Sequence, residues 1–165
     1  MKSQIQKQQT QATTVVGKKV FSTTLLALAC FASSTFAQSI PQSQVPSVIV
    51  NNFQKAHPKA FDVEWKLDRD YYKVDFETGL LNLDHDVWYD KSGKVIRHKE
   101  EISKSDLPKQ VQNAISKNFS GFRVEDVKKT TENNKATYSL DLKKLTEEWK
   151  VAFDSDGNVL SKIAD

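Results

Sequence analysis

The sequence has 165 residues, of which 38% are hydrophobic and 27% charged, a balance typical of a soluble globular protein of one ordinary domain or two small ones. This composition excludes a membrane protein, and five glycines and four prolines are too few for a collagen-like or proline-rich disordered chain. The formal charge is +3, but residues 1–37 hold four lysines and no acid, which leaves 20 basic against 21 acidic residues and excludes the basic excess that nucleic-acid binding requires.

The first 37 residues have the three parts of a signal peptide. Lys18 and Lys19 precede a run without any charge, residues 20–36, and Thr35 and Ala37 occupy the two positions where signal peptidase requires small residues. We therefore expect cleavage after Ala37 and a mature protein that is periplasmic or secreted. The alternative is a membrane anchor, because an apolar run of about 17 residues is at the lower limit for spanning a bilayer.

Cys30 is the only cysteine of the chain and lies within this segment. A lipoprotein signal also ends in a cysteine, but Leu28 stands where such signals have a small residue, and apolar residues continue beyond Cys30. Lipidation of Cys30 stays an alternative to cleavage after Ala37. If cleavage follows Ala37, the mature protein has no disulfide, no thiolate metal site and no cysteine nucleophile.

The rest of the sequence contains three pairs of similar blocks in the same order. Their offsets differ only by small loop insertions, which is typical of an internal duplication. We therefore expect a signal peptide, residues 1–37, followed by two repeats, residues 38–102 and 103–165. The paired blocks are 45–53 with 107–115, 72–76 with 138–142, and 87–96 with 151–160.

Each repeat begins with a segment that predicts a helix, at residues 46–57 and 108–118. Pro46 and Pro108 suit the first turn of a helix, where a backbone N–H is not needed, and apolar residues then recur at helical spacing. The first segment ends before a proline and the second near a glycine, both of which end helices.

Alternating apolar and polar residues predict antiparallel strands after each helix. Val74 and Phe76 alternate with Lys73 and Asp75, and residues 149–153 show the same period of two.

Two tight turns are predicted at residues 90–93 and 154–157, where an aspartate is followed by a glycine three residues later. No alternation of strand and helix demands a parallel sheet. The predicted fold class is therefore α+β, a tandem duplication of one helix followed by a four-stranded antiparallel sheet. The helices cover one sheet face, and the other is free to meet solvent or a partner.

Three features of the sequence together resemble those of a known family. They are the Leu/Val-Pro-x-x-Val/Ile start of each helix, the segment Val63-Glu64-Trp65, and the turn at residues 89–95. They resemble the PepSY-like, beta-lactamase-inhibitor-like family of exported bacterial proteins over about residues 43–163. The resemblance implies helix-plus-antiparallel-sheet units like those of beta-lactamase inhibitor protein, in the cell envelope or outside the cell. It implies binding or inhibition, with no catalytic residues or cofactor.

Residues that support metal or catalytic chemistry are few. His57, His85 and His98 do not have the spacing of metal ligands, because neither an HxxxH nor an HxH pair is present. Asp84 and Asp86 flank His85, but alternation along a strand sends both carboxylates to one face and the imidazole to the other. Neither a GxSxG motif nor a glycine-rich phosphate loop is present. We therefore predict no enzyme activity, no catalytic residue, no metal site and no cofactor.

Aromatic residues are the stronger candidates for function. In the outward register, Tyr71 and Trp88 of the first repeat correspond to Thr137 and Ala152 of the second, so the first repeat carries extra aromatics. Interfaces favour tryptophan and tyrosine, which offer a large contact area at low entropic cost. We therefore expect Trp65, Tyr71 and Trp88 to be binding residues. The alternative is that these rings pack beneath a loop or against the other repeat.

The sequence thus predicts an exported, non-catalytic binding or inhibitor-like module. Its open sheet face would engage a protein or peptide of the envelope or the extracellular space, and no stable membrane span would remain after removal of the signal. The alternative function is a small-ligand or polysaccharide-sensing module, in which the aromatic rings would stack on the ligand.

Overall fold

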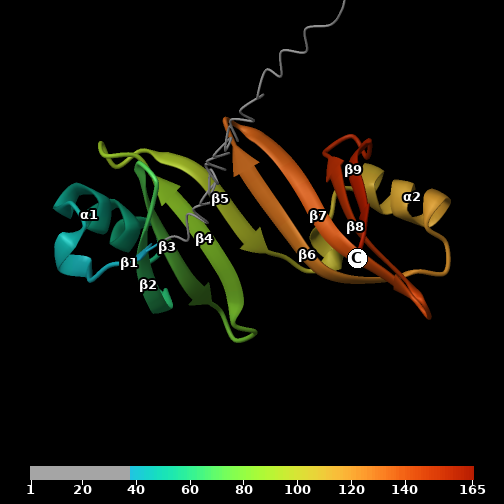
Figure 1. Ribbon diagram of the computed structural model, residues 1–165, viewed down its shortest axis with the longest axis horizontal. Coiled ribbons are helices and arrows are strands. Elements are labelled where there is room, and N and C mark those ends of the chain that lie inside the picture. The colour runs from blue at the N-terminus through green and yellow to red at the C-terminus, as the bar shows by residue number, and fades with distance from the viewer. Residues whose placement is uncertain (1–37) are drawn as a thin grey trace, which may run out of the picture. The chain divides into compact units, whose positions relative to one another are not determined.

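The computed structural model describes residues 38–165, in which nine antiparallel strands form one sheet. Each strand pairs only with its neighbours in the sequence, so the sheet order follows the chain from β1 to β9 (Figure 1). The expected signal peptide, residues 1–37, lies outside the described residues. The first half contains β1 (Gln38–Ser39), the 3-10 helix η1 (Gln42–Gln44), α1 (Ser47–Ala56), β2 (Phe61–Asp68), β3 (Tyr71–Thr78), β4 (Leu83–Tyr89) and β5 (Val95–Glu101). The second half contains the 3-10 helix η2 (Lys104–Asp106), α2 (Lys109–Asn118), β6 (Arg123–Glu132), β7 (Lys135–Lys144), β8 (Glu147–Asp154) and β9 (Val159–Ala164).

The predicted fold class is wrong. In place of an α+β duplication with a four-stranded sheet in each half, the described chain is mostly β, with one nine-stranded sheet and two α-helices of ten residues each. The halves join because β5 pairs with β6, which places Arg97 opposite Glu132 and Glu101 opposite Lys128. An unpaired strand edge exposes backbone donors and acceptors, and the β5–β6 pairing satisfies both edges at once. The division of the chain into repeats at residues 102 and 103 stays a prediction.

Both predicted helices are confirmed, and each begins directly after a proline. Pro46 is the N-cap of α1 and Pro108 that of α2. The buried residues of α1 are Ile49 and Phe53, which are four positions apart and therefore lie on one side of the helix. Within residues 38–165, no helix has the length and hydropathy needed to cross a bilayer.

Both predicted turns are confirmed as well. Gly93 and Gly157 have φ angles of 86° and 84°, in the region that favours glycine. In the first turn a carboxylate oxygen of Asp90 accepts two backbone N–H groups, and Asp154 does the same in the second. A Cβ atom at position 157 would lie 2.6 Å from the carbonyl oxygen of Gln110, so the second turn packs directly against the backbone of α2.

Each α-helix packs on its own apolar core. The core under α1 consists of Val45, Ile49, Phe53, Trp65, Val74, Phe76, Val87 and Tyr89. The core under α2 consists of Leu107, Val111, Ile115, Phe119, Val127, Tyr138, Leu140, Leu142, Val151 and Phe153.

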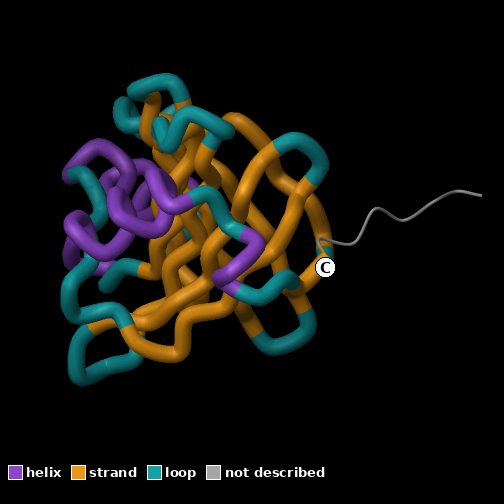
Figure 2. Tube along the Cα trace, turned by 90° about the vertical axis from the view of Figure 1, so that its left-hand side faces the viewer, coloured by secondary structure: helices purple, strands orange, loops and turns teal. Residues whose placement is uncertain are grey.

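The strand register shows that both cores lie on the same face of the sheet. One row of directly paired residues crosses from the first core to the second: Phe76, His85, Glu100, Lys129, Tyr138 and Phe153. Directly paired residues point to the same face, so we name this the helix face and the opposite one the open face. Figure 2 shows the α-helices gathered to one side of the strands. His85, Glu100 and Lys129 of this row are polar, and they separate the two cores.

Candidate functional site

Trp88 lies on the open face of the first half. It lies on β4 between Lys73 of β3 and Arg97 of β5, which are its direct cross-strand neighbours. The Lys73 Nζ and Arg97 Cζ atoms each lie 5.1 Å from the centroid of the indole ring, within the range of a cation–π interaction. The indole N–H donates to Oδ2 of Asp68 at 2.7 Å. The half-buried ring is therefore held in one orientation and loses little side-chain entropy when a partner binds.

Tyr71 lines a small pocket together with Trp88. Its side chain is 39% exposed, and the pocket of about 250 Å³ is also lined by Asp68, Arg97 and Glu132. Pockets for drug-sized ligands hold roughly 300–1,000 Å³. The volume therefore suits one side chain of a partner better than a whole ligand of that size.

A second hollow of the open face, about 320 Å³ in volume, is acidic. Lys73 links it to Trp88, because its Nζ atom lies 2.7 Å from Oδ1 of Asp75 and 3.0 Å from Oδ1 of Asp86. Burial raises the pKa of Asp86, and the neighbouring Asp75 raises it further. Seven carboxylates line this hollow, which we name the acidic groove, against two lining lysines and the adjacent Lys66 and Lys73, so negative charge is in excess. The carboxylates are Asp62, Glu64, Asp75, Glu77, Asp84, Asp86 and Glu101, and the lysines are Lys99 and Lys128.

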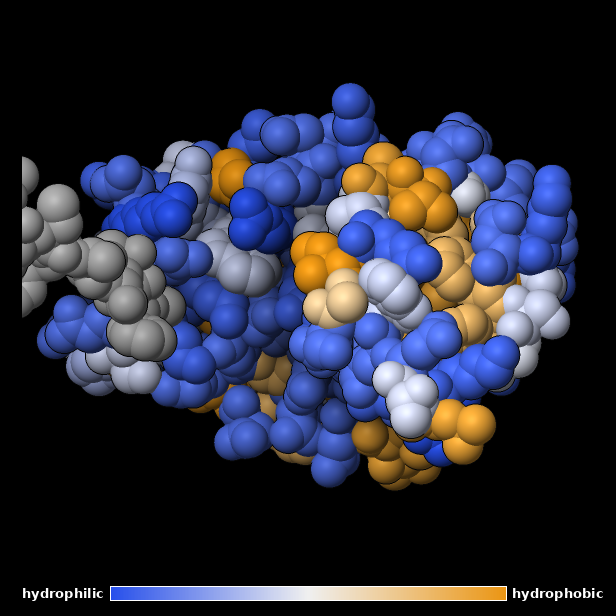
Figure 3. Space-filling model, turned by 45° about the vertical axis from the view of Figure 1, so that its right-hand side comes forward, coloured by the Kyte–Doolittle hydropathy of each residue, from blue (hydrophilic) through white to orange (hydrophobic). Residues whose placement is uncertain are grey.

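The open face of the second half has no counterpart of the Tyr71–Trp88 pair. The residues at the corresponding positions are Thr137 and Ala152, whose small side chains leave no large ring there. The side of the molecule that comes forward in Figure 3 is mostly hydrophilic, and its apolar atoms form separate patches. The aromatic difference between the halves that the sequence indicates is therefore also a difference between two surfaces.

Trp65, the third expected binding residue, lies in the core. Alternation along β2 places Glu64 and Lys66 on the open face and Trp65 on the helix face, where it is 3% exposed. Its ring meets that of Phe53 edge to face, with centroids 5.4 Å apart. A ring packed in this way has no surface for a partner, so the candidate site consists of Tyr71 and Trp88 without Trp65.

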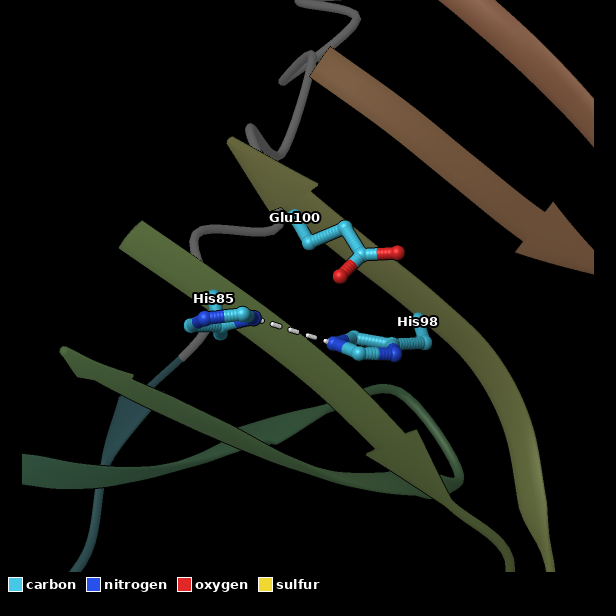
Figure 4. Close-up of side chains that lie close together, drawn as sticks. All are labelled: His85, His98 and Glu100. Atoms are coloured by element: carbon cyan, nitrogen blue, oxygen red, sulfur yellow. Dashed lines mark hydrogen bonds between the residues drawn. The ribbon is translucent and has the colours of Figure 1, made fainter. Parts of the chain in front are cut away.

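The helix face brings the three histidines of the chain together. His85 Nδ1 lies 3.2 Å from His98 Nε2, and the two rings are stacked with centroids 5.4 Å apart. His57 is the C-cap of α1, and its ring centroid lies 5.9 Å from that of His98. Figure 4 shows the carboxylate of Glu100 and the rings of His85 and His98 directed at the same space. We name His57, His85 and His98 the histidine cluster.

Burial is the main influence on these imidazoles, and it lowers the pKa of all three. The positive charge that a protonated neighbour would carry lowers the pKa of His57 and His98 further, while Glu100 partly opposes the effect. These lowered pKa values favour neutral imidazoles, so one of the two facing nitrogens of His85 and His98 carries a hydrogen and donates it to the other.

The distances between these histidines along the sequence do not indicate the cluster. The signal that identifies it is strand register, because Val87 pairs with His98 and His85 pairs with Glu100 across the β4–β5 hairpin. His85 and His98 are thus diagonal neighbours on one face, within reach of long side chains.

Comparison with known proteins gives matches to a family and to solved structures. A model of the family described as "Putative beta-lactamase-inhibitor-like, PepSY-like" matches residues 34–96 and 70–161. No curated protein matches the chain.

Three similar crystal structures come from Bacteroides species. One, described as a putative periplasmic protein from Bacteroides eggerthii, is 21% identical with a TM-score of 0.61, over 73% of this chain and 88% of that one. A DUF2874 family protein from Bacteroides uniformis is 21% identical with a TM-score of 0.60, over 72% and 88% of the two chains. A BLIP-like protein from Bacteroides fragilis is 19% identical with a TM-score of 0.59, over 76% and 87%.

At these identities the similarity to solved structures shows the fold alone. The family match extends over residues 34–161, well beyond half of the chain, and agrees with the motifs at the helix starts and turns. The chain belongs to the PepSY-like, beta-lactamase-inhibitor-like family.

Proposed function

We propose that this chain is an exported, non-catalytic binding module of the inhibitor-like kind, which engages a protein or peptide of the envelope or the extracellular space with its open face. The observation that carries the proposal is the fixed, half-exposed ring of Trp88 beside the exposed Tyr71, on a sheet face that neither α-helix covers. Interface hot spots favour tryptophan and tyrosine held in well-packed surroundings.

The charge of the neighbouring surface supports a basic partner. The acidic groove continues from Trp88 through Lys73, Asp75 and Asp86. A partner with arginine or lysine side chains would bring opposite charges together, which speeds association and makes binding weaken with salt. An aromatic contact at Trp88 and basic side chains in the acidic groove are therefore the two parts of the proposed interface.

Two observations support a location in the periplasm or outside the cell. Residues 1–37 have the pattern of a signal peptide, with Thr35 and Ala37 at the expected cleavage site. A structurally similar protein from Bacteroides eggerthii is described as a putative periplasmic protein. A binding module in this location would meet other exported proteins or peptides.

A small-ligand or polysaccharide-sensing role has weaker support. Stacking on a sugar needs a free ring face, whereas Lys73 and Arg97 both lie over the ring of Trp88. The pocket beside Tyr71 is also small for a ligand of several rings.

Affinity capture from envelope extracts tests the proposed function. Tagged wild-type protein and the Tyr71→Ala, Trp88→Ala double variant would be compared, with Thr137→Ala as the matched control in the second half. We expect one partner to be retained by the wild type and the control, to be lost at high salt, and to bind the double variant about 30-fold more weakly or worse.

Thermal unfolding of each variant shows that the comparison is made between folded proteins. Equal capture by the wild type and a folded double variant would contradict the proposal. Recovery of a soluble oligosaccharide in place of a protein would favour the sensing role.

A further inference from the structure

We propose that His85, His98 and Glu100 form a binding site for a divalent transition-metal ion such as Zn²⁺, with one coordination position open to solvent. The site lies on the helix face, between the two apolar cores, and Trp88 and Tyr71 lie on the open face. Because His85 also lines the acidic groove, variants of His98 and of Trp88 test the two proposals separately.

The donor atoms are already close to coordination geometry. Two ligand atoms bound to a tetrahedral Zn²⁺ at 2.0–2.1 Å lie about 3.4 Å apart. A hydrogen bond holds His85 Nδ1 and His98 Nε2 3.2 Å apart, and a metal ion would take the place of its hydrogen. A carboxylate oxygen of Glu100 lies within 4.8 Å of both nitrogens. For the third contact, the Glu100 side chain would have to bring this oxygen closer to the two nitrogens, against its ion pair with Lys129. All three residues are half-buried, so an ion there would be partly removed from water.

Neighbouring side chains hold the ring of His85 in the orientation that a ligand needs. Thr78 Oγ1 lies 2.7 Å from Nε2 of His85, and the ring of Phe76 stacks on the imidazole with centroids 4.9 Å apart and an interplanar angle of 10°. If Nε2 of His85 carries the hydrogen and donates it to Thr78, Nδ1 accepts the hydrogen bond from Nε2 of His98, and a metal ion would displace that hydrogen. A hydrogen bond from the second nitrogen is how metal-binding histidines are usually held.

The second half shows that the fold does not require imidazoles at these positions. Strands β8 and β9 pair in the same register as β4 and β5, and they place Trp149 where His85 lies and Lys162 where His98 lies. The Lys162 Nζ atom lies 3.7 Å from the ring centroid of Trp149, so a cation–π pair occupies this place. The two halves therefore have the same strand pairing at this place but different side chains, and only the first half has two histidines there.

Access to the site is open on one side. A pocket of about 580 Å³ is lined by His98, Glu100, Lys129, Thr131 and Asn133, among others. A water molecule or a donor atom of a partner could reach the ion from this pocket and complete its coordination. Metal sites with an open position of this kind commonly use three protein ligands.

Lys129 is the charge that opposes a cation at this place. Its Nζ atom donates to Oε1 of Glu100 at 3.0 Å, which orients the carboxylate but also places a positive charge beside the site. Nitrogen and carboxylate donors together suit Zn²⁺ and similar transition ions better than Mg²⁺ or Ca²⁺, which prefer oxygen alone. The opposing charge gives a specific expectation: its removal should strengthen binding.

Calorimetric titration of the purified protein with zinc chloride at neutral pH tests the proposal. We expect one ion per chain, at least about tenfold weaker binding in His85→Gln and in His98→Gln, and weaker binding in Glu100→Gln. Lys129→Gln should bind at least about threefold more tightly, because a neighbouring positive charge is removed. His57→Gln is the matched control, since it removes a histidine of the cluster without removing a proposed ligand.

Nitrogen NMR of the histidine rings gives a readout that needs no variant. Zn²⁺ should shift Nδ1 of His85 and Nε2 of His98 and leave the ring nitrogens of His57 nearly unchanged. Absence of saturable binding up to about 100 µM Zn²⁺ would overturn the proposal. So would binding that is equally strong in the wild type and in folded His85→Gln and His98→Gln.

Discussion

Replacement of Tyr89 by phenylalanine should not lower the free energy of unfolding at neutral pH and should raise it slightly. The same change should reduce the fall of this free energy at alkaline pH. Tyr89 is 1% exposed, and within the described part of the chain its hydroxyl has no hydrogen-bond partner. A buried polar group without a partner costs about 1–3 kcal/mol. The Tyr89→Phe change keeps the ring that fills the core, so we expect a gain of about 1 kcal/mol in the free energy of unfolding at pH 7. Phe153 already occupies the matching place before the second turn, fully buried.

The alkaline effect follows from the pKa of the same hydroxyl. Burial raises the pKa of Tyr89 from 10.0 to about 12. Above pH 10 the unfolded chain loses this proton while the folded chain keeps it, so the free energy of unfolding falls as the pH rises from 10 to about 12. The difference corresponds to at most about 2.7 kcal/mol.

Urea unfolding of wild type and Tyr89→Phe at pH 7, 10 and 11 measures both effects, because the two proteins differ only in this hydroxyl group. The two stabilities should diverge above pH 10, with the wild type falling faster. Parallel curves above pH 10, or a Tyr89→Phe variant that is less stable by more than about 1 kcal/mol at pH 7, would show that the buried hydroxyl does not have these effects.

Three further predictions concern the cores, the turns and the N-terminal segment. Ile49→Ala, at a fully buried position, should lower the free energy of unfolding by about 2–5 kcal/mol. Val48→Ala, at a position that is 43% exposed, should change it by less than about 0.5 kcal/mol. Chemical denaturation of the two variants measures both values. Gly157→Ala should lower stability by at least about 1 kcal/mol more than Gly79→Ala does. Both glycines have positive φ, but only at position 157 would the new Cβ lie against a carbonyl of α2. Thermal unfolding measures the two losses of stability, and equal losses would show that the contact is unimportant. Intact mass of the exported protein should correspond to a chain that begins at Gln38, and a lipid adduct on the cysteine or a retained N-terminus would contradict cleavage there.

Local features of the fold could be predicted from the sequence because their causes are local. Pro46 and Pro108 identify both helix starts, and Gly93 and Gly157 identify both turns. The joining of the halves into one sheet depends on the β5–β6 pairing, between segments separated by η2 and α2. Alternation along a strand reports which residues share a face, but it does not report which strand lies next to it.

The histidine cluster shows how one extra residue can hide a site. Val95 pairs with Tyr89, but Arg97 pairs with Trp88, so the register shifts by one residue at this point of the β4–β5 hairpin. Without that bulge, counting from the turn would place His85 opposite Lys99 and send His85 and His98 to opposite faces. Such a slip reverses the face of every later residue, and bulges are not evident from composition or periodicity.

The same limit explains why Trp65 was expected to be a binding residue although it lies in the core. Trp65 and Trp88 both lie in alternating strands, and the period of two does not say which of the two faces meets the helix. The structure places Trp65 beneath α1 and Trp88 on the open face. The comparison of Trp88 with Ala152 indicates the half-buried ring of the open face, and its role in binding stays a prediction.

Site-specific photo-crosslinking tests the central claim, binding of a partner at the open face, most directly. The photoreactive residue p-benzoylphenylalanine would replace Tyr71 on the open face or, in a separate variant, Val48 on α1, in cells that produce and export the protein. We expect one discrete protein adduct from position 71, its loss when Trp88→Ala is added, and no adduct of that mass from position 48. An adduct formed from position 48 alone, or none from position 71, would contradict the central claim.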